Sequence, residues 1–229
     1  MSKKKIKVKV KKRKLKIKRI LICLLVIILV CLLVYYISIL PIKNIYVIGN
    51  SILSDKEIIK LGGISNYPSF IRTTTREIKK NIESNVYIDE VTIEKKLYNK
   101  VYIHITEKKV VCTYDNKLLL SDGTEVENTY NITSYPILSS DISTIKDKFV
   151  TKFSLINENI LLKISEIEYT PNDVDSERFT LKMNDGNLVY ITLSKIEKIN
   201  KYNSIYSSLE GKKGIIYLDS GDYVEVKEE

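Results

Sequence analysis

Residues 20–40 form an uninterrupted apolar stretch that contains no charged side chain. At a rise of about 1.5 Å per residue, a helix of this length spans about 30 Å, the thickness of the hydrocarbon core of a bilayer. A helix of a soluble protein is apolar along one stripe, whereas this stretch is apolar on every side. A buried helix would need more surrounding protein than a chain of 229 residues readily supplies. We therefore predict a transmembrane helix over 20–40.

The charges that flank this stretch predict its orientation. The segment 1–19 contains twelve Lys or Arg and no acidic side chain. Because positively charged flanks stay in the cytoplasm, we predict that residues 1–19 form a basic cytoplasmic tail and that the chain after Pro41 lies outside the cell membrane. A cleaved signal peptide would have a shorter apolar region and a small-residue cleavage site, which is not found here. The sequence thus predicts an uncleaved single-pass anchor of type II orientation.

The net charge of +9 belongs to the tail rather than to the folded part. Over the segment 20–229, 25 basic and 28 acidic side chains leave a net charge of −3. Domains that bind nucleic acid carry a basic face, so we expect no nucleic acid partner for the exported part. The tail can attract anionic lipid head groups at about 1 kcal/mol per basic residue, or it can serve only to set the topology. We favour the second role.

Residues 42–110 show a mixed pattern of strands and short helices. Apolar and polar residues alternate in the predicted strands, as they do where one face of a sheet is buried. Ser54 and Glu57 have the spacing of a capping box, in which each side chain bonds to the other residue's backbone at the start of a helix. The predicted elements are a strand at 42–48, a helix after Ser54, a helix at 74–83, and strands at 86–97 and 101–106.

Residues 111–229 are predicted to be mostly strand. Short apolar runs are separated by turn residues such as those at 115–116, which favour a hairpin. Apolar residues recur every three or four positions over 149–160 and 195–209, which predicts two helices. Residues 127–143 are polar and rich in turn formers. The predicted strands are 110–114, 117–120, 167–169, 179–183, 188–193, 214–218 and 223–226.

Five motifs follow one another along the exported chain: Ile45-x-Val47-x-Gly49-Asn50, Ile88-x-x-Val91-x-Ile93, Val101-x-Ile103-x-Ile105-x-Glu107, LLLSDGTE at 118–125 and YPIL at 135–138. Their order and spacing, together with the basic tail and the anchor, resemble the FtsQ/DivIB family of division proteins. The resemblance implies an α+β fold: a single-pass anchor, a POTRA domain (β-α-α-β-β) at 42–110, and a mostly antiparallel β domain with flanking helices at 111–229. The turn at 97–100 lacks the proline that is common in the family, so we expect a divergent member.

The exported part offers few groups that could perform chemistry. It contains one histidine, His104, and one cysteine, Cys112, on consecutive predicted strands that we expect to be neighbours. Neither lies beside a helix N-terminus or a basic cluster that would activate a thiol. We therefore interpret them as a solvent-facing histidine and a packed thiol rather than as a nucleophilic pair.

Metal and cofactor sites are not predicted either. One His and one Cys cannot form a zinc site without carboxylates. The acidic residues at 173–177 and 219–222 lack the spacing of a calcium loop. The glycines at 62–63 and 211–214 end helices rather than begin them, so they do not form a phosphate cradle. We expect no catalytic residue, no metal, no cofactor and no small-molecule substrate.

Since no catalytic, metal or cofactor site is predicted, we expect the exported part to act by binding a partner through its secondary structure. A strand at the edge of a sheet can accept a strand from a partner through backbone hydrogen bonds. Residues 214–218 can form such an edge, or they can form an internal strand that is already paired on both sides. The family resemblance implies that this terminal strand and the helix before it dock the bitopic division proteins FtsL and FtsB/DivIC. The candidate partner-binding residues are Tyr202, Tyr206, Ile215, Ile216, Tyr217 and Leu218.

These features lead to a first functional hypothesis, a non-enzymatic scaffold in the cell membrane at the division septum. Such a scaffold would bind other bitopic division proteins and support septal peptidoglycan synthesis. The alternative is a POTRA-type accessory protein that handles polypeptides during export, which would usually precede a β-barrel. A membrane-tethered hydrolase is a third possibility, and the lack of a catalytic set disfavours it.

Overall fold

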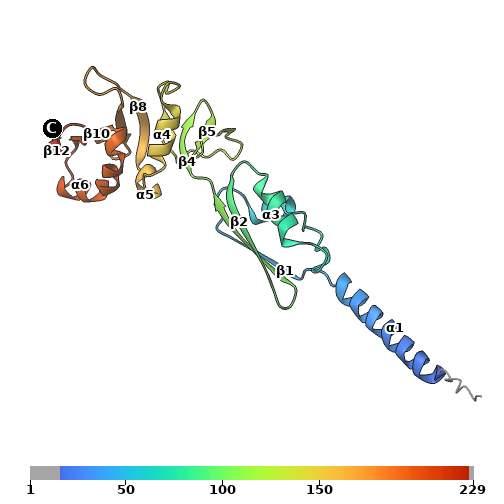
Figure 1. Ribbon diagram of the computed structural model, residues 1–229. Coiled ribbons are helices and arrows are strands. Elements are labelled where there is room, and N and C mark those ends of the chain that lie inside the picture. Colours follow the sequence, from blue (N-terminus) through green and yellow to red (C-terminus); the bar gives the residue numbers. More distant parts are fainter. Residues whose placement is uncertain (1–15, 227–229) are drawn as a thin grey trace, which may run out of the picture.

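The computed structural model describes residues 16–226 and shows an elongated molecule (Figure 1). Helix α1 (Ile17–Ile39) extends from one end, followed by an N-terminal domain and then a C-terminal domain. The side chains of α1 are not buried against other described residues, and the helix is long and apolar enough to cross a membrane. Most of the predicted basic tail, at 1–15, lies outside the described residues.

The N-terminal domain has the predicted order of strand, helix, helix, strand and strand. Its strands form a sheet in the order β1-β3-β2, in which β1 is parallel and β2 is antiparallel to β3. The two helices pack against one face of the sheet. The elements are β1 (Asn44–Ile48), α2 (Asp55–Leu61), α3 (Thr75–Glu83), β2 (Ile88–Lys96) and β3 (Lys100–Glu107).

Local sequence signals account for the two helices of this domain. The predicted capping box is present: the Ser54 hydroxyl accepts from the Glu57 backbone N–H, and the Glu57 carboxylate accepts from the Ser54 backbone N–H. The hydroxyl of Thr74 caps α3 in the same way. Apolar residues four apart, Ile78 and Ile82, are fully buried and hold α3 on the sheet. The helices are thus specified by their caps and by one apolar face.

The carboxylate of Glu107, at the end of β3, fastens the loop that follows β1. It accepts hydrogen bonds from the backbone N–H groups of Ser51, Ile52 and Leu53 at 2.7–2.9 Å, and from the Ser51 hydroxyl at 2.7 Å. A carboxylate that accepts several backbone donors makes stronger hydrogen bonds than a neutral acceptor. This one side chain therefore connects the last strand of the domain to the entry of α2.

We expect Glu107→Ala to destabilise the N-terminal domain by about 2 kcal/mol, because part-buried donors at Ile52 and Leu53 lose their acceptor. Glu107→Gln, which keeps one acceptor oxygen, should lose less. Urea unfolding of the full chain in detergent measures both. Equal stability of Glu107→Ala and the wild type would show that water replaces the carboxylate without loss.

The C-terminal domain contains one sheet of nine strands covered on one face by helices. The strand order is β12-β11-β10-β9-β8-β7-β4-β5-β6. Neighbours are antiparallel except at β10–β11, β4–β7 and β7–β8, which are parallel. The strands are β4 (Val110–Tyr114), β5 (Lys117–Leu120), β6 (Glu125–Glu127), β7 (Ile137–Leu138), β8 (Ile164–Tyr169), β9 (Arg178–Met183), β10 (Leu188–Thr192), β11 (Gly214–Tyr217) and β12 (Tyr223–Val226).

Two of the helices predicted for this domain differ in detail. The single helix expected at 149–160 is two, α4 (Lys146–Phe153) and α5 (Glu158–Leu161), because the chain turns after Ser154 and restarts at the N-cap Asn157. The helix expected at 195–209 begins as a 3₁₀ helix, η1 (Leu193–Lys201), and continues as α6 (Tyr202–Ser208).

A threefold spacing explains the 3₁₀ segment. The buried residues Leu193, Ile196, Ile199 and Tyr202 recur every three positions. Side chains three apart lie directly above one another in a helix of three residues per turn, so this geometry buries all four together. The 3₁₀ turns are therefore a consequence of the apolar spacing.

The two domains are joined without a flexible linker. Only Lys108 and Lys109 separate β3 from β4, and Val110 and Leu118 of the C-terminal sheet pack in the core of the N-terminal domain. The ammonium of Lys109 donates to backbone carbonyls that follow α4, including that of Ser154 at 3.0 Å. The shared core and these bonds hold the two domains in one arrangement (Figure 1).

Candidate partner-binding site

The two groups weighed as a nucleophilic pair do not come together. His104 lies half-buried in β3, and Cys112 lies in β4, which belongs to the other sheet. The prediction that these two residues lie on neighbouring strands is therefore wrong. The thiol of Cys112 is fully buried. Burial raises the pKa of this thiol to about 12, which leaves it protonated at neutral pH.

Three of the five acidic side chains at 173–177 and 219–222 are paired with basic residues: Glu177, Asp219 and Asp222. Within residues 16–226, no group of three or more His, Cys, Asp or Glu could hold a metal ion. Asp219 accepts from Arg178 Nε at 2.9 Å, and Asp222 accepts from Lys198 Nζ at 2.6 Å. Although burial opposes it, hydrogen bonds from Arg178 and Ser220 lower the pKa of Asp219. These carboxylates serve as links between β9, η1 and the end of the sheet.

The structure resolves the two possibilities left open for residues 214–218. Strand β11 is internal, because it pairs with β10 on one side and with β12 on the other. Of the six candidate partner-binding residues, Tyr202, Ile216 and Leu218 are buried in the core, and only Ile215, Tyr217 and Tyr206 reach the surface. Ile215 and Tyr217 lie on the sheet face opposite the helices, whereas Tyr206 lies on α6. The six residues therefore do not form one surface.

The buried side chain of Tyr202 connects several elements of the C-terminal domain through hydrogen bonds. Its hydroxyl donates to Asp185 at 2.6 Å and accepts from the Asn187 side-chain amide at 3.0 Å. The Asn187 carbonyl oxygen in turn accepts from the Gly214 backbone N–H at 2.8 Å. This network connects the β9–β10 hairpin to the first residue of β11, so Tyr202 positions β11 from within the core.

The open edge at this end of the sheet is β12. It pairs with β11 on one side only, in the register Tyr217 opposite Tyr223 and Gly214 opposite Val226. Figure 1 places β12 at the end of the molecule farthest from α1. Tyr223 and Val226 are 46% and 45% exposed. A short, half-exposed outer strand of this kind has backbone donors and acceptors available for a further strand.

An aromatic ladder crosses the face of the sheet that the helices leave uncovered. The ring of Tyr223 stacks on Tyr217 at 4.5 Å, and Tyr217 lies 5.3 Å from Tyr190. The guanidinium of Arg178 covers Tyr190 at 4.0 Å. Tyrosines supply large contact areas with few rotatable bonds, which favours them in interfaces. The ladder leads from the interior of the sheet to its open edge.

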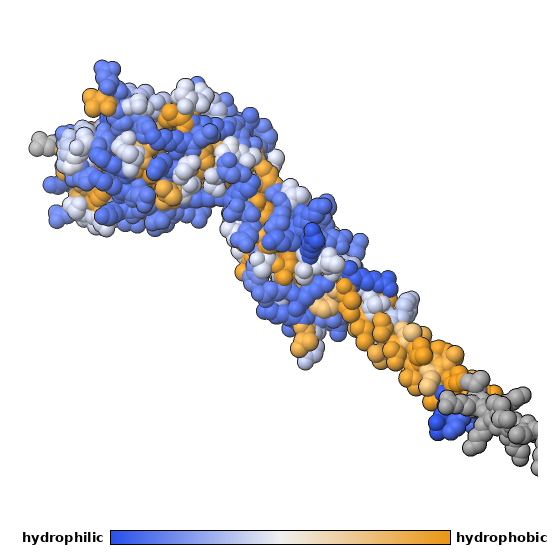
Figure 2. Space-filling model, in the orientation of Figure 1, coloured by the Kyte–Doolittle hydropathy of each residue, from blue (hydrophilic) through white to orange (hydrophobic). Residues whose placement is uncertain are grey.

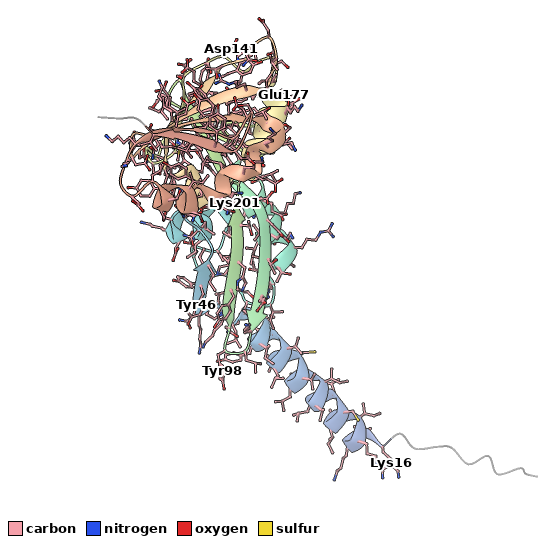
Figure 3. All side chains as sticks on the ribbon, turned by 90° about the vertical axis from the view of Figure 1, so that its left-hand side faces the viewer. Lys16, Tyr46, Tyr98, Asp141, Glu177 and Lys201 are labelled. Atoms are coloured by element: carbon pink, nitrogen blue, oxygen red, sulfur yellow. The ribbon has the colours of Figure 1, made fainter. Side chains whose placement is uncertain are left out.

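A groove of about 380 Å³ lies on the other face of the same edge, between α6 and β12. Its floor is apolar, formed by Ile205, Ile216 and Val224. Its rim carries Lys201 and the ion pair of Lys198 with Asp222. Lys201, which Figure 3 labels, is exposed at the end of η1. A strand added to β12 would thus meet tyrosines on one face and an apolar groove with basic residues on the other.

Sequence reasoning found the strand at 223–226 but assigned it no role. The predicted partner-binding strand is 214–218 instead, because it is the more hydrophobic of the two strands. That pattern reflects burial on a central strand. The signal that favours β12 is its amphipathic composition, Tyr-Val-Glu-Val, next to the acidic loop at 219–222.

The opposite edge of the sheet, β6, is less suited to strand addition. It is only three residues long, Glu125–Glu127. The Glu125 carboxylate is engaged by Lys146 at 2.5 Å, and the lysine lowers the pKa of this acid through a hydrogen bond and its charge. Short edges with charged side chains discourage pairing with another chain.

Known proteins share both domains of this chain. Residues 40–108 match the FtsQ-type POTRA domain, and residues 110–223 match the C-terminal region of the cell division protein FtsQ/DivIB. The cell division protein DivIB of Bacillus anthracis is 30% identical over 204 residues, covering 84% of this chain and 77% of the relative. The same protein of Bacillus subtilis is 32% identical over 193 residues, covering 80% and 73%.

Among solved structures, the major extracytoplasmic domain of the trans isomer of DivIB from Geobacillus stearothermophilus overlaps with this chain. The overlap covers 46% of this chain and 96% of that domain, with a TM-score of 0.38 and 19% identity. The family models span the two folded domains in the predicted order, which confirms the resemblance found in the sequence. The chain belongs to the FtsQ/DivIB family of cell division proteins.

Proposed function

We propose that this protein is a non-enzymatic scaffold of cell division that uses the open edge of β12 to bind other bitopic division proteins. The partners are FtsL and an FtsB/DivIC-like protein, and the site of action is the division septum, where the complex supports septal peptidoglycan synthesis. The matches to cell division proteins favour this role over that of an accessory in polypeptide export.

The observation that carries the proposal is the combination of features at β12. The outer side of β12 pairs with no other described strand, a tyrosine ladder lies on one face of this edge, and an apolar groove lies on the other. Backbone hydrogen bonds along an edge give affinity, and pockets for alternate side chains give selectivity. An extended partner segment with apolar side chains toward the groove and an acidic one toward Lys201 fits this edge, because Lys198 is already paired with Asp222.

The anchor and the shape of the molecule support the same role. Helix α1 would hold the protein in the cell membrane with its N-terminus in the cytoplasm, according to the positive charges of the segment 1–19. The two domains then project outward in one elongated body, and β12 lies at the end farthest from α1 (Figure 1). The binding edge can therefore meet the outer segments of membrane-bound partners.

A scaffold without catalysis is consistent with the chemistry of the exported part. The thiol of Cys112 is buried and protonated, and His104 lies in another sheet. At the candidate edge, the Glu225 carboxylate accepts a hydrogen bond from the Tyr217 hydroxyl at 3.1 Å. What the exported part presents to a partner is its side-chain surface and the backbone donors and acceptors of its outer strands.

Depletion of the protein in its own organism tests the division role. We expect filamentous or unseptated cells, and a fluorescently tagged copy at midcell. A wild-type copy should restore septation, and so should Val174→Lys, which changes a fully exposed residue of the β8–β9 loop, outside β12. Normal septation after depletion, together with an even distribution of the tagged copy over the membrane, would contradict the proposal.

A further inference from the structure

The turn between β2 and β3 lies beside the outer end of the membrane helix. The side-chain amide of Asn99 donates to the backbone carbonyl of Pro41 at 2.8 Å, and the Lys43 N–H donates to the Asn99 carbonyl at 2.9 Å. Pro41 is only two residues beyond the end of α1. Figure 1 shows the β2–β3 hairpin pointing toward the end of α1 that adjoins the domain, and Figure 3 labels Tyr98 at its tip. The turn is therefore held at a fixed height relative to the helix.

The tip of this turn is apolar and exposed. Leu97 is 84% and Tyr98 is 79% exposed, and neither side chain packs in a described core. Figure 2 shows apolar surface at the tip of this hairpin, next to the apolar surface of α1. Exposure of large apolar side chains to water is unfavourable, and the free energy falls when another phase or surface covers them.

The backbone of Tyr98 adds a second, independent observation. Both central residues of the turn have positive φ, 64° for Tyr98 and 56° for Asn99. Asn or Gly is the usual residue at the first of these positions, and a bulky side chain there is an outlier. No contact among the described residues of the domain compensates Tyr98, since its side chain is exposed. Packing within the folded chain therefore gives no reason for a tyrosine at this position.

A second exposed loop is bonded to the same end of α1. The backbone N–H of Phe70 donates to the Leu40 carbonyl at 2.8 Å, and the Ser69 hydroxyl donates to the Ser38 carbonyl at 2.6 Å. The next residue, Ile71, is 53% exposed. The end of the membrane helix is therefore bounded by two loops that both present apolar side chains.

We propose that Leu97, Tyr98 and Ile71 enter the interface of the outer membrane leaflet and fix the tilt of the N-terminal domain on the membrane. The apolar stretch at 20–40 spans the hydrocarbon core, so a turn bonded to Pro41 lies at the level of the lipid head groups. Tyrosine is enriched at this level because its ring is apolar and its hydroxyl is polar. Exposed basic residues beside the loops, Lys43 and Arg72, complement anionic head groups.

The surface that covers the tip is lipid, because the tip lies beside the outer end of α1. Any surface that covers the tip must be present wherever α1 is embedded, and the lipid around α1 meets that condition. Contact with lipid at two loops would hold the domain upright and direct β12 away from the membrane. The inference rests on the anchor role proposed above for α1, but not on β12 or on its partners.

The absence of tryptophan from the chain makes a direct test possible. Single-tryptophan variants of the full chain are reconstituted in vesicles of phosphatidylcholine and phosphatidylglycerol, with and without bromine on the acyl chains. Tyr98→Trp reports on the tip. Val174→Trp, at a loop residue that is 96% exposed, reports on water, and Leu29→Trp, in the middle of α1, reports on the hydrocarbon core. Leu97→Trp gives a second reporter of the tip that does not occupy the strained position.

We expect the emission of Tyr98→Trp and Leu97→Trp to shift to shorter wavelength than that of Val174→Trp. Brominated lipid should quench both, by an amount between the loss for Leu29→Trp and the small loss for Val174→Trp. Tip reporters that behave like Val174→Trp while Leu29→Trp is quenched would overturn the inference and leave the anchor intact. A blue shift without quenching would also overturn it, because protein would then cover the tip. No quenching of Leu29→Trp would overturn the anchor role as well.

Discussion

Gly49→Ala is expected to destabilise the N-terminal domain by more than about 3 kcal/mol, the largest effect of any single methyl group added to this chain. Gly49 follows β1 with φ of 94°, a conformation that L side chains rarely adopt. A Cβ atom at this position would lie 2.2 Å from the backbone carbonyl oxygen of Ile105. Because that oxygen belongs to the central strand β3, neither partner can move without loss of sheet pairing.

Gly123→Ala is the matched control for this variant. Gly123 has a similar φ of 83°, but a Cβ there would meet no atom within 4 Å. Its substitution should cost only about 1–2 kcal/mol, the strain of the left-handed conformation alone. Urea unfolding and amide hydrogen exchange of the full chain in detergent compare the two. Equal losses of stability would show that β3 gives way to the new methyl group and that the contact is not a rigid one.

Lysine at the open edge is expected to abolish most partner binding. We expect the double variant Tyr223→Lys/Val226→Lys to bind the outer segment of the FtsB/DivIC-like partner about 100-fold more weakly, which corresponds to about 2.7 kcal/mol. Tyr223 loses its stacking on Tyr217, and two ammonium groups would have to be desolvated beside an incoming strand. Both residues are about half exposed, so the fold itself should remain.

The control for this prediction places the same chemistry elsewhere in the C-terminal domain. Tyr114→Lys and Val174→Lys alter exposed residues that lie outside the β12 edge. Titration of each full-length variant in lipid nanodiscs with the partner segment gives the affinities. Both controls should bind as the wild type does. A double variant at β12 with unchanged affinity would move the interface to another part of the molecule.

The N-terminal domain could be predicted from the sequence because its signals are local. The Ser54–Glu57 capping box, the spacing of Ile78 and Ile82, and the alternation in β3 each depend on residues close together in the chain. The apolar helix α1 is equally local, since its length and composition predict it. These features agree with the structure to within a few residues at their ends.

The candidate site was harder to predict because it depends on pairing between distant strands. The pattern at 214–218 is the same for an edge strand and for a central one, and only the parallel pairing with β10 decides between them. The burial of Tyr202 depends on Asp185 and Asn187, which lie in a hairpin earlier in the chain. A tyrosine on a predicted helix carries no local sign of such partners, so it was assigned to the surface.

Amide hydrogen exchange across the C-terminal sheet tests the central proposal most directly. The full chain in nanodiscs is exchanged with and without the outer segment of the FtsB/DivIC-like partner. Strand addition to β12 predicts that amides within Tyr223–Val226 become protected on binding, while those of β6, at the opposite edge, exchange as before. Binding that leaves the β12 amides unprotected and protects another region would contradict the account.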